Sequence, residues 1–376
     1  MINLRLTPIL AVLLLTGTSA VAQMSLTPPG LQPPVTDKPK PLERPAEKPK
    51  AAEKAAEKPA ERPVERPTAA AKKPASPPAA AAKPAAPAPT TAAPPPNDPN
   101  VDLVYGAYQR GQYKTAFDLA TAKAQSGDVK AMTMLGQLYE NAMGVKRDFD
   151  KAASWYKRAA DSGDREAMFA LAMMRLAGRG GPVDQQGAVK LLASAAKLGE
   201  PKAAYNLALL YLDGQTLPQD VKRAAELLRM AADAGNPEAQ YALATFYKEG
   251  TGVPKDPEKA AQLLQAAALA ENVDAEVEYA IALYNGTGTQ KNLPAAVALL
   301  RKAARQNSPI AQNRLAWVLY YGSGTPADKV EAYKWHLVAK TAGKGDPQLD
   351  EKFANLSPED RTKGEAEAKR WLGATK

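Results

Sequence analysis

The sequence predicts an all-α protein, in which stacked helix pairs form a solenoid behind a signal peptide and a disordered Pro/Ala/Lys-rich linker. Composition gives the boundary, since 22 of the 33 prolines lie in residues 1–100. Periodicity gives the fold, because alanines recur every 36 residues through residues 101–346. A period of about 20 to 50 residues is typical of solenoids, whose units bury their apolar faces only by stacking.

Composition also excludes several kinds of site. The 376 residues contain no cysteine and one histidine, His336, which excludes disulfides, thiol nucleophiles and histidine-pair metal sites. The net charge of +9 divides into +5 in residues 1–100 and +4 in the rest, where 36 Lys/Arg accompany 32 Asp/Glu. This near balance argues against a nucleic-acid surface. We expect no cofactor, no metal and no nucleic-acid partner.

Residues 1–22 have the pattern of a secretory signal peptide. A positive charge precedes an apolar run at residues 9–15, and the small residues Ala20 and Ala22 predict cleavage between Ala22 and Gln23. The apolar run is shorter than the ~20 residues of a membrane-spanning helix. We therefore expect a periplasmic or secreted bacterial protein, with membrane contact only if the leader is retained.

Residues 23–100 form a Pro/Ala/Lys/Glu-rich linker that we expect to be disordered. Charge–charge–proline steps recur, as in Glu61-Arg62-Pro63. Because almost nothing here can be buried, folding would not offset the lost chain entropy, and the prolines interrupt helices. The favoured interpretation is a solubilising spacer. The alternatives are a wall-crossing tether, a docking strip for a partner, or a basic segment that binds the cell wall.

Three alanine columns keep the 36-residue step through six units. Small side chains at fixed positions let helices approach closely, so we expect these columns to lie between packed helices. Their members are Ala131, Ala167, Ala203, Ala239, Ala275 and Ala311; Ala152, Ala188, Ala224, Ala260, Ala296 and Ala332; and Ala159, Ala195, Ala231, Ala267, Ala303 and Ala339.

Each unit predicts two helices with defined ends. In the fourth copy, Asn236 and Pro237 begin the first helix and Gly250 ends it. An Asp/Asn column then begins the second helix: Asp148, Asp184, Asp220, Asp256, Asn292 and Asp328. Glycine ends the second helix in most copies, and Glu271 and Asn307 replace it in two.

The residue pattern of the unit is seen most fully in copy 129–164. It runs through Ala131–Tyr139, Gly144-Val145, Asp148, Lys151-Ala152, Trp155-Tyr156 and Lys157–Ala160. By this pattern the chain resembles the Sel1-like repeat family, an α/α solenoid class related to tetratricopeptide repeats. The resemblance implies a right-handed solenoid and protein–protein scaffolding, with exported bacterial members acting as envelope adaptors or regulators. The copies are 129–164, 165–200, 201–236, 237–272, 273–308 and 309–346, after a short first pair at 102–127.

Two segments depart from the regular pattern. Copy 165–200 has Arg175 in a tyrosine column and Gly180-Gly181-Pro182 in its loop, which predicts a distorted turn. Residues 347–376 leave the 36-residue register, and Ser357-Pro358 predicts a helix start. We expect 347–376 to be a capping helix that covers the last open face of the stack.

No residue group predicts catalysis, so we expect a protein that is not an enzyme and assign no catalytic residue. His336 lies in a column otherwise filled by Tyr156 and leucines, which indicates a packing role. The Gly-x-Gly loops, such as Gly250-Thr251-Gly252, lack the Lys-Ser/Thr ending of a phosphate-binding loop and are interpreted as turns. An envelope hydrolase acting on β-lactams or wall fragments is the alternative.

Aromatic and apolar residues of the first helices predict a binding groove. If the units have the geometry of tetratricopeptide repeats, these residues point into the concave side and suit a peptide or helix. The predicted groove residues are Phe169, Met173, Tyr205, Leu209, Tyr241, Tyr284, Trp317, Tyr320 and Tyr321. The sequence therefore favours a non-enzymatic periplasmic scaffold that binds a protein or peptide partner of the cell envelope.

Overall fold

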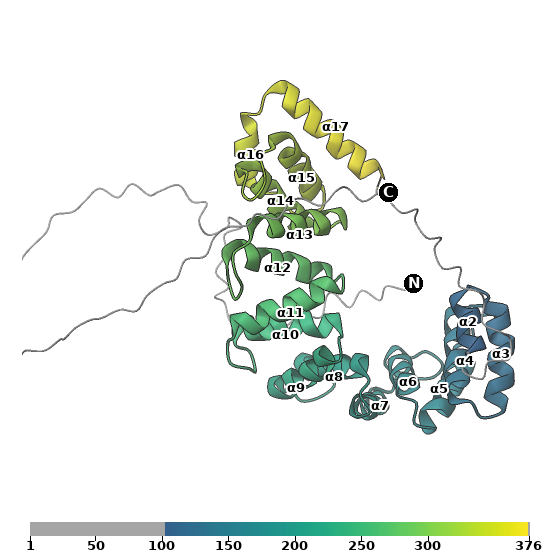
Figure 1. The fold of residues 1–376 in the computed structure, drawn as a ribbon. Helices are drawn as coiled ribbons and strands as arrows, with labels where there is room; N and C mark the ends of the chain where they lie inside the picture. The colour runs from purple at the N-terminus through teal and green to yellow at the C-terminus, as the bar shows by residue number, and fades with distance from the viewer. Residues whose placement is uncertain (1–101, 375–376) are drawn as a thin grey trace, which may run out of the picture. The chain divides into compact units, whose positions relative to one another are not determined.

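A computed structural model describes residues 102–374, and every regular element in that part of the chain is an α-helix (Figure 1). The predictions for the leader, for cleavage at Ala22/Gln23 and for the linker lie outside the described residues. The helices are α2 (Leu103–Gln109), α3 (Tyr113–Gln125), α4 (Val129–Asn141), α5 (Phe149–Asp161), α6 (Arg165–Ala177), α7 (Gln185–Lys197), α8 (Pro201–Asp213), α9 (Val221–Asp233), α10 (Pro237–Glu249), α11 (Pro257–Leu269), α12 (Val273–Asn285), α13 (Leu293–Arg305), α14 (Pro309–Tyr321), α15 (Lys329–Thr341), α16 (Pro347–Ala354) and α17 (Pro358–Ala374).

The helices form stacked pairs in chain order, which confirms the predicted all-α repeat. From α4 to α15 every helix has 13 residues, and equivalent helices start 36 residues apart. From α3 to α14 each helix packs on the helix before it and the helix after it, so α4 pairs with α5 and α5 then packs on α6 (Figure 1). The structure therefore consists of six pairs, α4/α5 to α14/α15, preceded by the shorter pair α2/α3.

The helix ends are formed as the sequence predicts. Asp256 accepts a hydrogen bond from the Lys259 amide at 2.9 Å, and the other members of its column cap their helices in the same way. Glycine at the end of the first helix has a left-handed φ, as at Gly250 (+80°). At the end of the second helix, where most copies have glycine, Glu271 (φ +63°) and Asn307 (φ +62°) adopt the same left-handed conformation.

A second glycine in the loop allows close contact with the preceding pair. A Cβ on Gly288 would lie 1.9 Å from the carbonyl oxygen of Pro257, the first residue of α11. Gly144, Gly180, Gly252 and Gly324 meet the starts of earlier second helices in the same way. This confirms that the Gly-x-Gly loops are turns. In copy 165–200, α6 and α7 keep the usual bounds, and positive φ values at Gly180 and Gly181 confine the distortion to the loop.

The alanine columns lie in the core between the helices. All 18 members are at most 3% exposed, so the helices approach each other closely along these columns. Larger side chains fill the remaining space, as Leu135, Leu192 and Leu315 do with no exposed surface. Gly136 in α4 stands where the five later copies have Ala172, Ala208, Ala244, Ala280 and Ala316. The ring of Tyr156 lies so near that a Cβ on Gly136 would be 2.5 Å from it.

The C-terminal segment forms two helices where we expected one. Ser357 accepts a hydrogen bond from the Asp360 amide at 3.1 Å and begins α17, whereas α16 starts earlier, at Pro347. α17 packs against α15. α16 buries Leu349 and Phe353 in the core formed by α12 to α15.

Candidate functional site

The predicted groove residues lie on five of the six first helices, α6, α8, α10, α12 and α14, and none lies on α4. We call the solvent-facing side of the six first helices the first-helix face. Phe169 on α6, Tyr205 on α8 and Tyr241 on α10 occupy one column and are half-buried. Each ring packs against the core along one side and leaves the other side accessible. The first helices of three successive pairs, α6, α8 and α10, thus present aromatic surface at intervals of one repeat.

The other predicted residues divide into open and covered positions. Met173 on α6 and Tyr284 on α12 are half-buried and contribute to the first-helix face. Leu209 is 8% exposed and packs into the core. Trp317 is 1% exposed and has no open surface. The structure therefore leaves five predicted residues partly accessible on α6 to α12 and buries Leu209 and Trp317: the accessible ones are Phe169, Met173, Tyr205, Tyr241 and Tyr284.

At the α14 end of the face, residues of α16 and its cap contact the aromatic side chains, although Tyr321 stays 39% exposed. The indole N–H of Trp317 donates to a carboxylate oxygen of Asp346 at 2.8 Å, and Asp346 also caps α16. The ammonium group of Lys352 on α16 lies over the rings of Trp317, Tyr320 and Tyr321, at 5.3 to 5.8 Å from the ring centres. These three aromatic side chains therefore bind the C-terminal cap.

The groove predicted from aromatic and apolar columns did not include the charged residues on the same face. Glu238 and Asp274 are exposed in the first turns of α10 and α12. Glu278, one turn after Asp274, accepts a hydrogen bond from Lys248 on α10 at 3.0 Å. The sequence could have indicated these acids, because equivalent positions of the repeat are acidic in three copies. Glu166, Glu238 and Asp274 each stand directly before an alanine of the first column.

These carboxylates act on the tyrosines beside them. Burial, with the nearby charges of Glu278 and Asp274, raises the pKa of Tyr241 to about 12. Burial and Glu238 raise the pKa of Tyr205 as well. Although Asp274 keeps exposed surface, protein atoms crowd its carboxyl group and partly desolvate it, which raises its pKa, and repulsion from Glu278 raises this pKa further. The face around α10 and α12 therefore combines neutral phenols with carboxylates.

Direct contacts show that the first helices of successive pairs are neighbours. The Lys248–Glu278 contact joins α10 to α12, and Thr133 on α4 donates to Asp164, the cap of α6, at 3.2 Å. At the α2 end of the face there is a hollow of about 390 Å³, with Tyr105, Thr133 and Glu166 among its lining residues. Side-chain contacts thus join the first helices at α4/α6 and at α10/α12.

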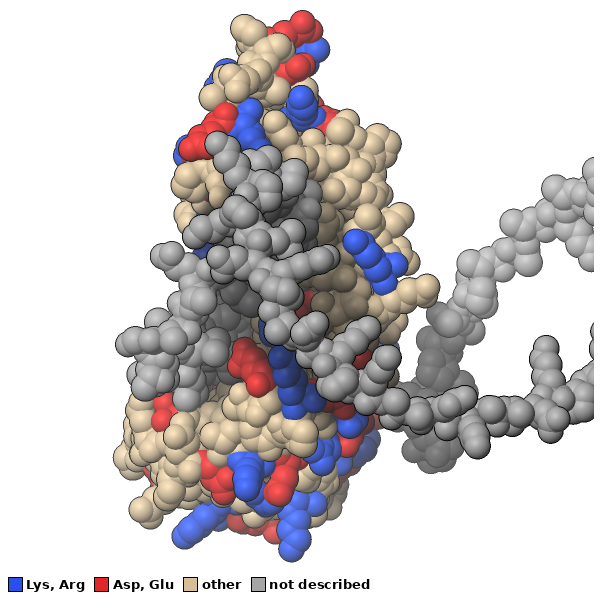
Figure 2. Space-filling model, turned by 90° about the vertical axis from the view of Figure 1, so that its left-hand side faces the viewer, with Lys and Arg blue, Asp and Glu red and all other residues tan. Residues whose placement is uncertain are grey.

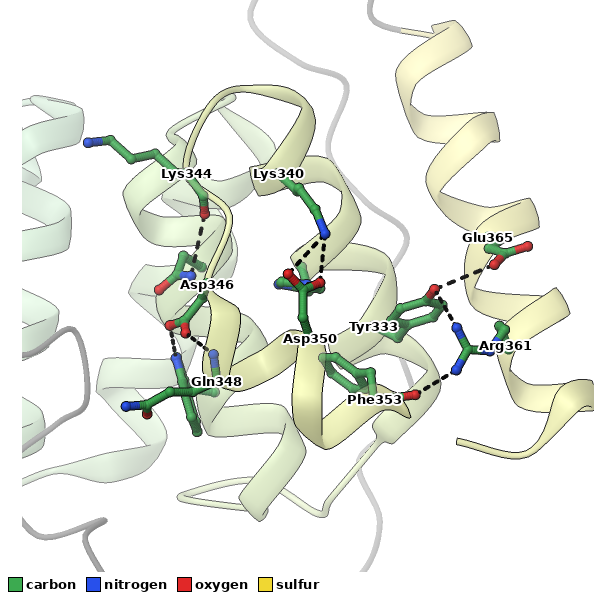
Figure 3. Close-up of polar contacts among 12 residues, drawn as sticks. Tyr333, Lys340, Lys344, Asp346, Gln348, Asp350, Phe353, Arg361 and Glu365 are labelled. Atoms are coloured by element: carbon green, nitrogen blue, oxygen red, sulfur yellow. Dashed lines mark hydrogen bonds and ion pairs between the residues drawn. The ribbon is translucent and has the colours of Figure 1, made fainter. Parts of the chain in front are cut away.

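His336 has a structural position in the C-terminal core. Its ring has no exposed surface, and Nε2 lies 2.8 Å from Asp350 Oδ1, which also accepts from Lys340 at 2.8 Å (Figure 3). Hydrogen bonds from Lys340 and His336 lower the pKa of Asp350. This cluster joins α15 to α16, in agreement with the predicted packing role, and the buried ring offers no access to a substrate.

Residues 102–374 contain neither a metal-binding cluster nor a membrane-spanning helix. No group of three or more His, Asp or Glu side chains is arranged to hold a metal ion there. None of the helices in this range combines the length and apolarity needed to cross a membrane. On the side shown in Figure 2, Lys/Arg and Asp/Glu side chains lie next to one another, with uncharged surface between the groups.

Comparison with known proteins identifies the repeat. A family model described as the Sel1 repeat matches residues 129–164, 165–200, 201–236, 237–272, 273–308 and 309–344. The chain belongs to the Sel1 repeat family. The last match of this Sel1 repeat protein ends at 344, two residues before the boundary drawn from the sequence at 346.

Several solved structures of bacterial proteins resemble the chain. A Sel1 repeat protein from Oxalobacter formigenes is 28% identical with a TM-score of 0.57, covering 64% of this chain and 98% of its own. A protective antigen present in uropathogenic Escherichia coli strains is 26% identical with a TM-score of 0.49, covering 71% of this chain and 67% of its own. An immunity protein, Pa5087 from Pseudomonas aeruginosa, is 20% identical with a TM-score of 0.38, covering 58% and 84%. No curated protein matches the chain significantly.

Proposed function

We propose that this Sel1 repeat protein is a non-enzymatic scaffold of the bacterial envelope that holds a protein partner on its first-helix face. The observation that carries the proposal is the column of half-buried rings, Phe169, Tyr205 and Tyr241, on three neighbouring helices. Membership of a repeat family whose units stack into an extended surface supports it.

The physical properties of this column suit recognition. Tyrosine and phenylalanine offer large contact areas, and rings already packed on one side lose little further entropy when a partner covers the other. The helices beneath them are rigid, because their backbones are capped and their alanine columns are buried. The carboxylates of Glu238 and Asp274 supply a polar rim that orients the partner.

The envelope location is proposed from the leader sequence. Residues 1–22 have the order of charge, apolar run and small residues that directs export, and the chain contains no cysteine for lipid attachment. On this proposal residues 23–100 are the spacer between the exported N-terminus and the repeats.

The test compares two triple variants of the full chain. Phe169, Tyr205 and Tyr241 are changed to alanine in the first. In the matched control, the exposed apolar residues Leu198, Met230 and Leu269, at or near the ends of second helices, are changed to alanine. Both are expressed in the native host with an affinity tag, and proteins crosslinked in living cells are quantified by mass spectrometry.

The proposal expects one or a few envelope proteins to be recovered with the wild type and the control and to fall at least about tenfold with the first variant. Far-UV circular dichroism should show equal helicity in all three proteins. Equal recovery with the first variant, or equal loss with both, would remove the first-helix face as the binding site.

A further inference from the structure

Methionine is concentrated at one end of the repeat array. Residues 102–374 contain seven methionines, and six of them lie between Met132 and Met174, on α4, on α6 and in the loop after α4. The seventh, Met230, lies on α9. In the four later copies the positions equivalent to the six hold residues of other types, as Leu209 does at the position of Met173. The repeat itself therefore does not require these methionines.

Four of the six methionines pack against the core. Met132 is 6% exposed and Met174 is 1% exposed. Met168 is half-buried and packs against two neighbouring core clusters, and Met143 packs against the core residues of α2, α3 and α4. Because the reactivity of a sulfur atom depends on its exposure, Met132 and Met174 are the best shielded from dissolved oxidants.

The other two methionines, Met134 on α4 and Met173 on α6, lie on the first-helix face. Met134 is half-buried and lines the hollow at the α2 end of this face. Met173 is half-buried and stands one turn after Phe169, on the same side of α6. The hydrogen bond from Thr133 to Asp164 joins the two helices. Both thioethers therefore belong to the surface that a partner would cover.

Hydroperoxides oxidise methionine by transfer of one oxygen atom. A lone pair of the thioether sulfur attacks one peroxide oxygen, so that an S–O bond forms while the O–O bond breaks. The sulfur loses two electrons and becomes a sulfoxide. The peroxide is reduced to water or to an alcohol, and the proton carried by the transferred oxygen passes to the departing one. The chain has no cysteine, so no thiol within it competes for the oxidant.

We infer that Met134 and Met173 are modification sites at which oxidation by hydroperoxides weakens partner binding. The inference rests on the proposed function, because it assigns a regulation to the same face. Oxidation converts an apolar side chain into one with a polar oxygen. A partner that covers this oxygen removes its water, which costs binding free energy unless a donor replaces the lost hydrogen bond. Methionine sulfoxide reductases reverse the change.

The fold should tolerate oxidation at these two positions. Both side chains keep access to solvent, so the added oxygen stays hydrated in the free protein. A sulfoxide at Met132 or Met174 would instead place an unpaired polar group in the core. Loss of binding without loss of helicity therefore distinguishes oxidation of the face from damage to the core.

The first test measures how fast each methionine of the purified full chain is oxidised. The protein is treated with hydrogen peroxide for increasing times and digested, and mass spectrometry gives the sulfoxide fraction at each position. Met134 and Met173 should react at least about tenfold faster than Met132 and Met174. Met230, which is 46% exposed on α9, should react as fast as the two face residues and serves as the reference. Equal rates at the face and core positions would overturn the inference.

The second test asks whether oxidation of these residues controls binding. The tagged full chain is oxidised with hydrogen peroxide, the peroxide is removed with catalase, and the chain is then crosslinked to the envelope fraction of the native host. Only the chain is oxidised in this way. Recovery of the partner identified with the untreated wild type should fall at least about tenfold after oxidation. Treatment with methionine sulfoxide reductases should restore it.

Two double variants assign the effect to residues. Met134→Leu with Met173→Leu should bind as the wild type does and stay unaffected by peroxide, because leucine has a similar volume and no thioether. In the matched control, Met143→Leu with Met230→Leu, both changes lie off the first-helix face, so peroxide should lower recovery as in the wild type. Far-UV circular dichroism should show equal helicity in all three proteins before and after oxidation.

Three results of the second test would overturn the inference. One is full recovery with the oxidised wild type. Another is an equal loss in the Met134/Met173 variant, and the third is resistance to peroxide in the Met143/Met230 control. If any of them occurs while alanine at Phe169, Tyr205 and Tyr241 still abolishes recovery, the inference fails and the proposed function stands. If that alanine variant binds as the wild type does, the proposed function fails and the inference fails with it.

Discussion

At the scale of single residues, Gly136 and Tyr156 show that the size of the side chain at one position of the repeat limits the size at another. The five later copies have alanine at the Gly136 position, while leucine or histidine stands at the Tyr156 position. In α4 the alanine is missing because the tyrosine ring fills its space, and the Tyr156 hydroxyl donates to Glu140 at 3.0 Å. The two positions are therefore coupled through packing.

This coupling predicts the result of a double-mutant cycle. Gly136→Ala should lower the free energy of unfolding by about 1–3 kcal/mol, because the added methyl overlaps the ring. In a Tyr156→Leu background the same change should be neutral or stabilising, since alanine favours the helix and the ring is gone. Urea unfolding of the four proteins, followed by circular dichroism, measures the coupling. An equal penalty in both backgrounds would contradict the packing argument.

Glu271 gives a second prediction at this scale. Its left-handed φ of +63° is one that glycine adopts freely and other residues adopt at a cost. We expect Glu271→Gly to raise the free energy of unfolding by about 0.5–1 kcal/mol, because relief of strain exceeds the entropy gained by the unfolded chain. Gly235→Ala, at the equivalent end of α9, should have the opposite sign in the same urea experiment.

At the scale of helices, α16 depends on the carboxylate of Asp350. The lowered pKa of this group, caused by Lys340 and His336, means that the folded state favours the charged form. The resulting stability is fully present above the ordinary aspartate pKa of 3.8 and is lost as the pH falls through the lower folded value. The side chain is 44% exposed, so the contribution is modest.

Asp350→Asn should accordingly reduce the protection of α16 against hydrogen exchange at pH 7. The difference from the wild type should shrink as the pH falls from 3.8 through the lower pKa of folded Asp350, where the wild-type carboxylate also becomes neutral. Hydrogen exchange measured by mass spectrometry over this range checks the sign. Asp360→Asn, an acidic residue in the first turn of α17, is the control for loss of one negative charge in the cap.

Most helices follow from the sequence, and the exceptions have a physical reason. The alanine columns, the Asp caps and the glycine stops are local signals, and each reappears at the expected residue from α4 to α15. The covering of Trp317 by α16 depends on residues outside the repeat, where no column exists to compare. The carboxylates of Glu238 and Asp274 were not predicted, because the predicted groove was defined by aromatic and apolar side chains and these acids stand three residues before the aromatic column.

At the scale of the whole repeat array, each pair contacts only its neighbours, so disturbances should remain local. Deletion of residues 347–376 removes the cover from Trp317 and the contact of α17 with α15. We expect faster hydrogen exchange in α14 and α15, and unchanged exchange from α4 to α9. Uniform loss of protection through α4 to α15 would show that the array unfolds as a single unit.

The constant 36-residue step between equivalent helices has a consequence for how such a chain changes length. Removing residues 237–272 would join Asn236 directly to Val273. The new junction would have the same residue types as the present one between Asn272 and Val273, with an asparagine that caps the following helix in both cases. Duplicating the same stretch would be equally seamless. Unequal recombination within the gene could therefore lengthen or shorten the array by whole helix pairs, and the type of junction between the remaining pairs would not change.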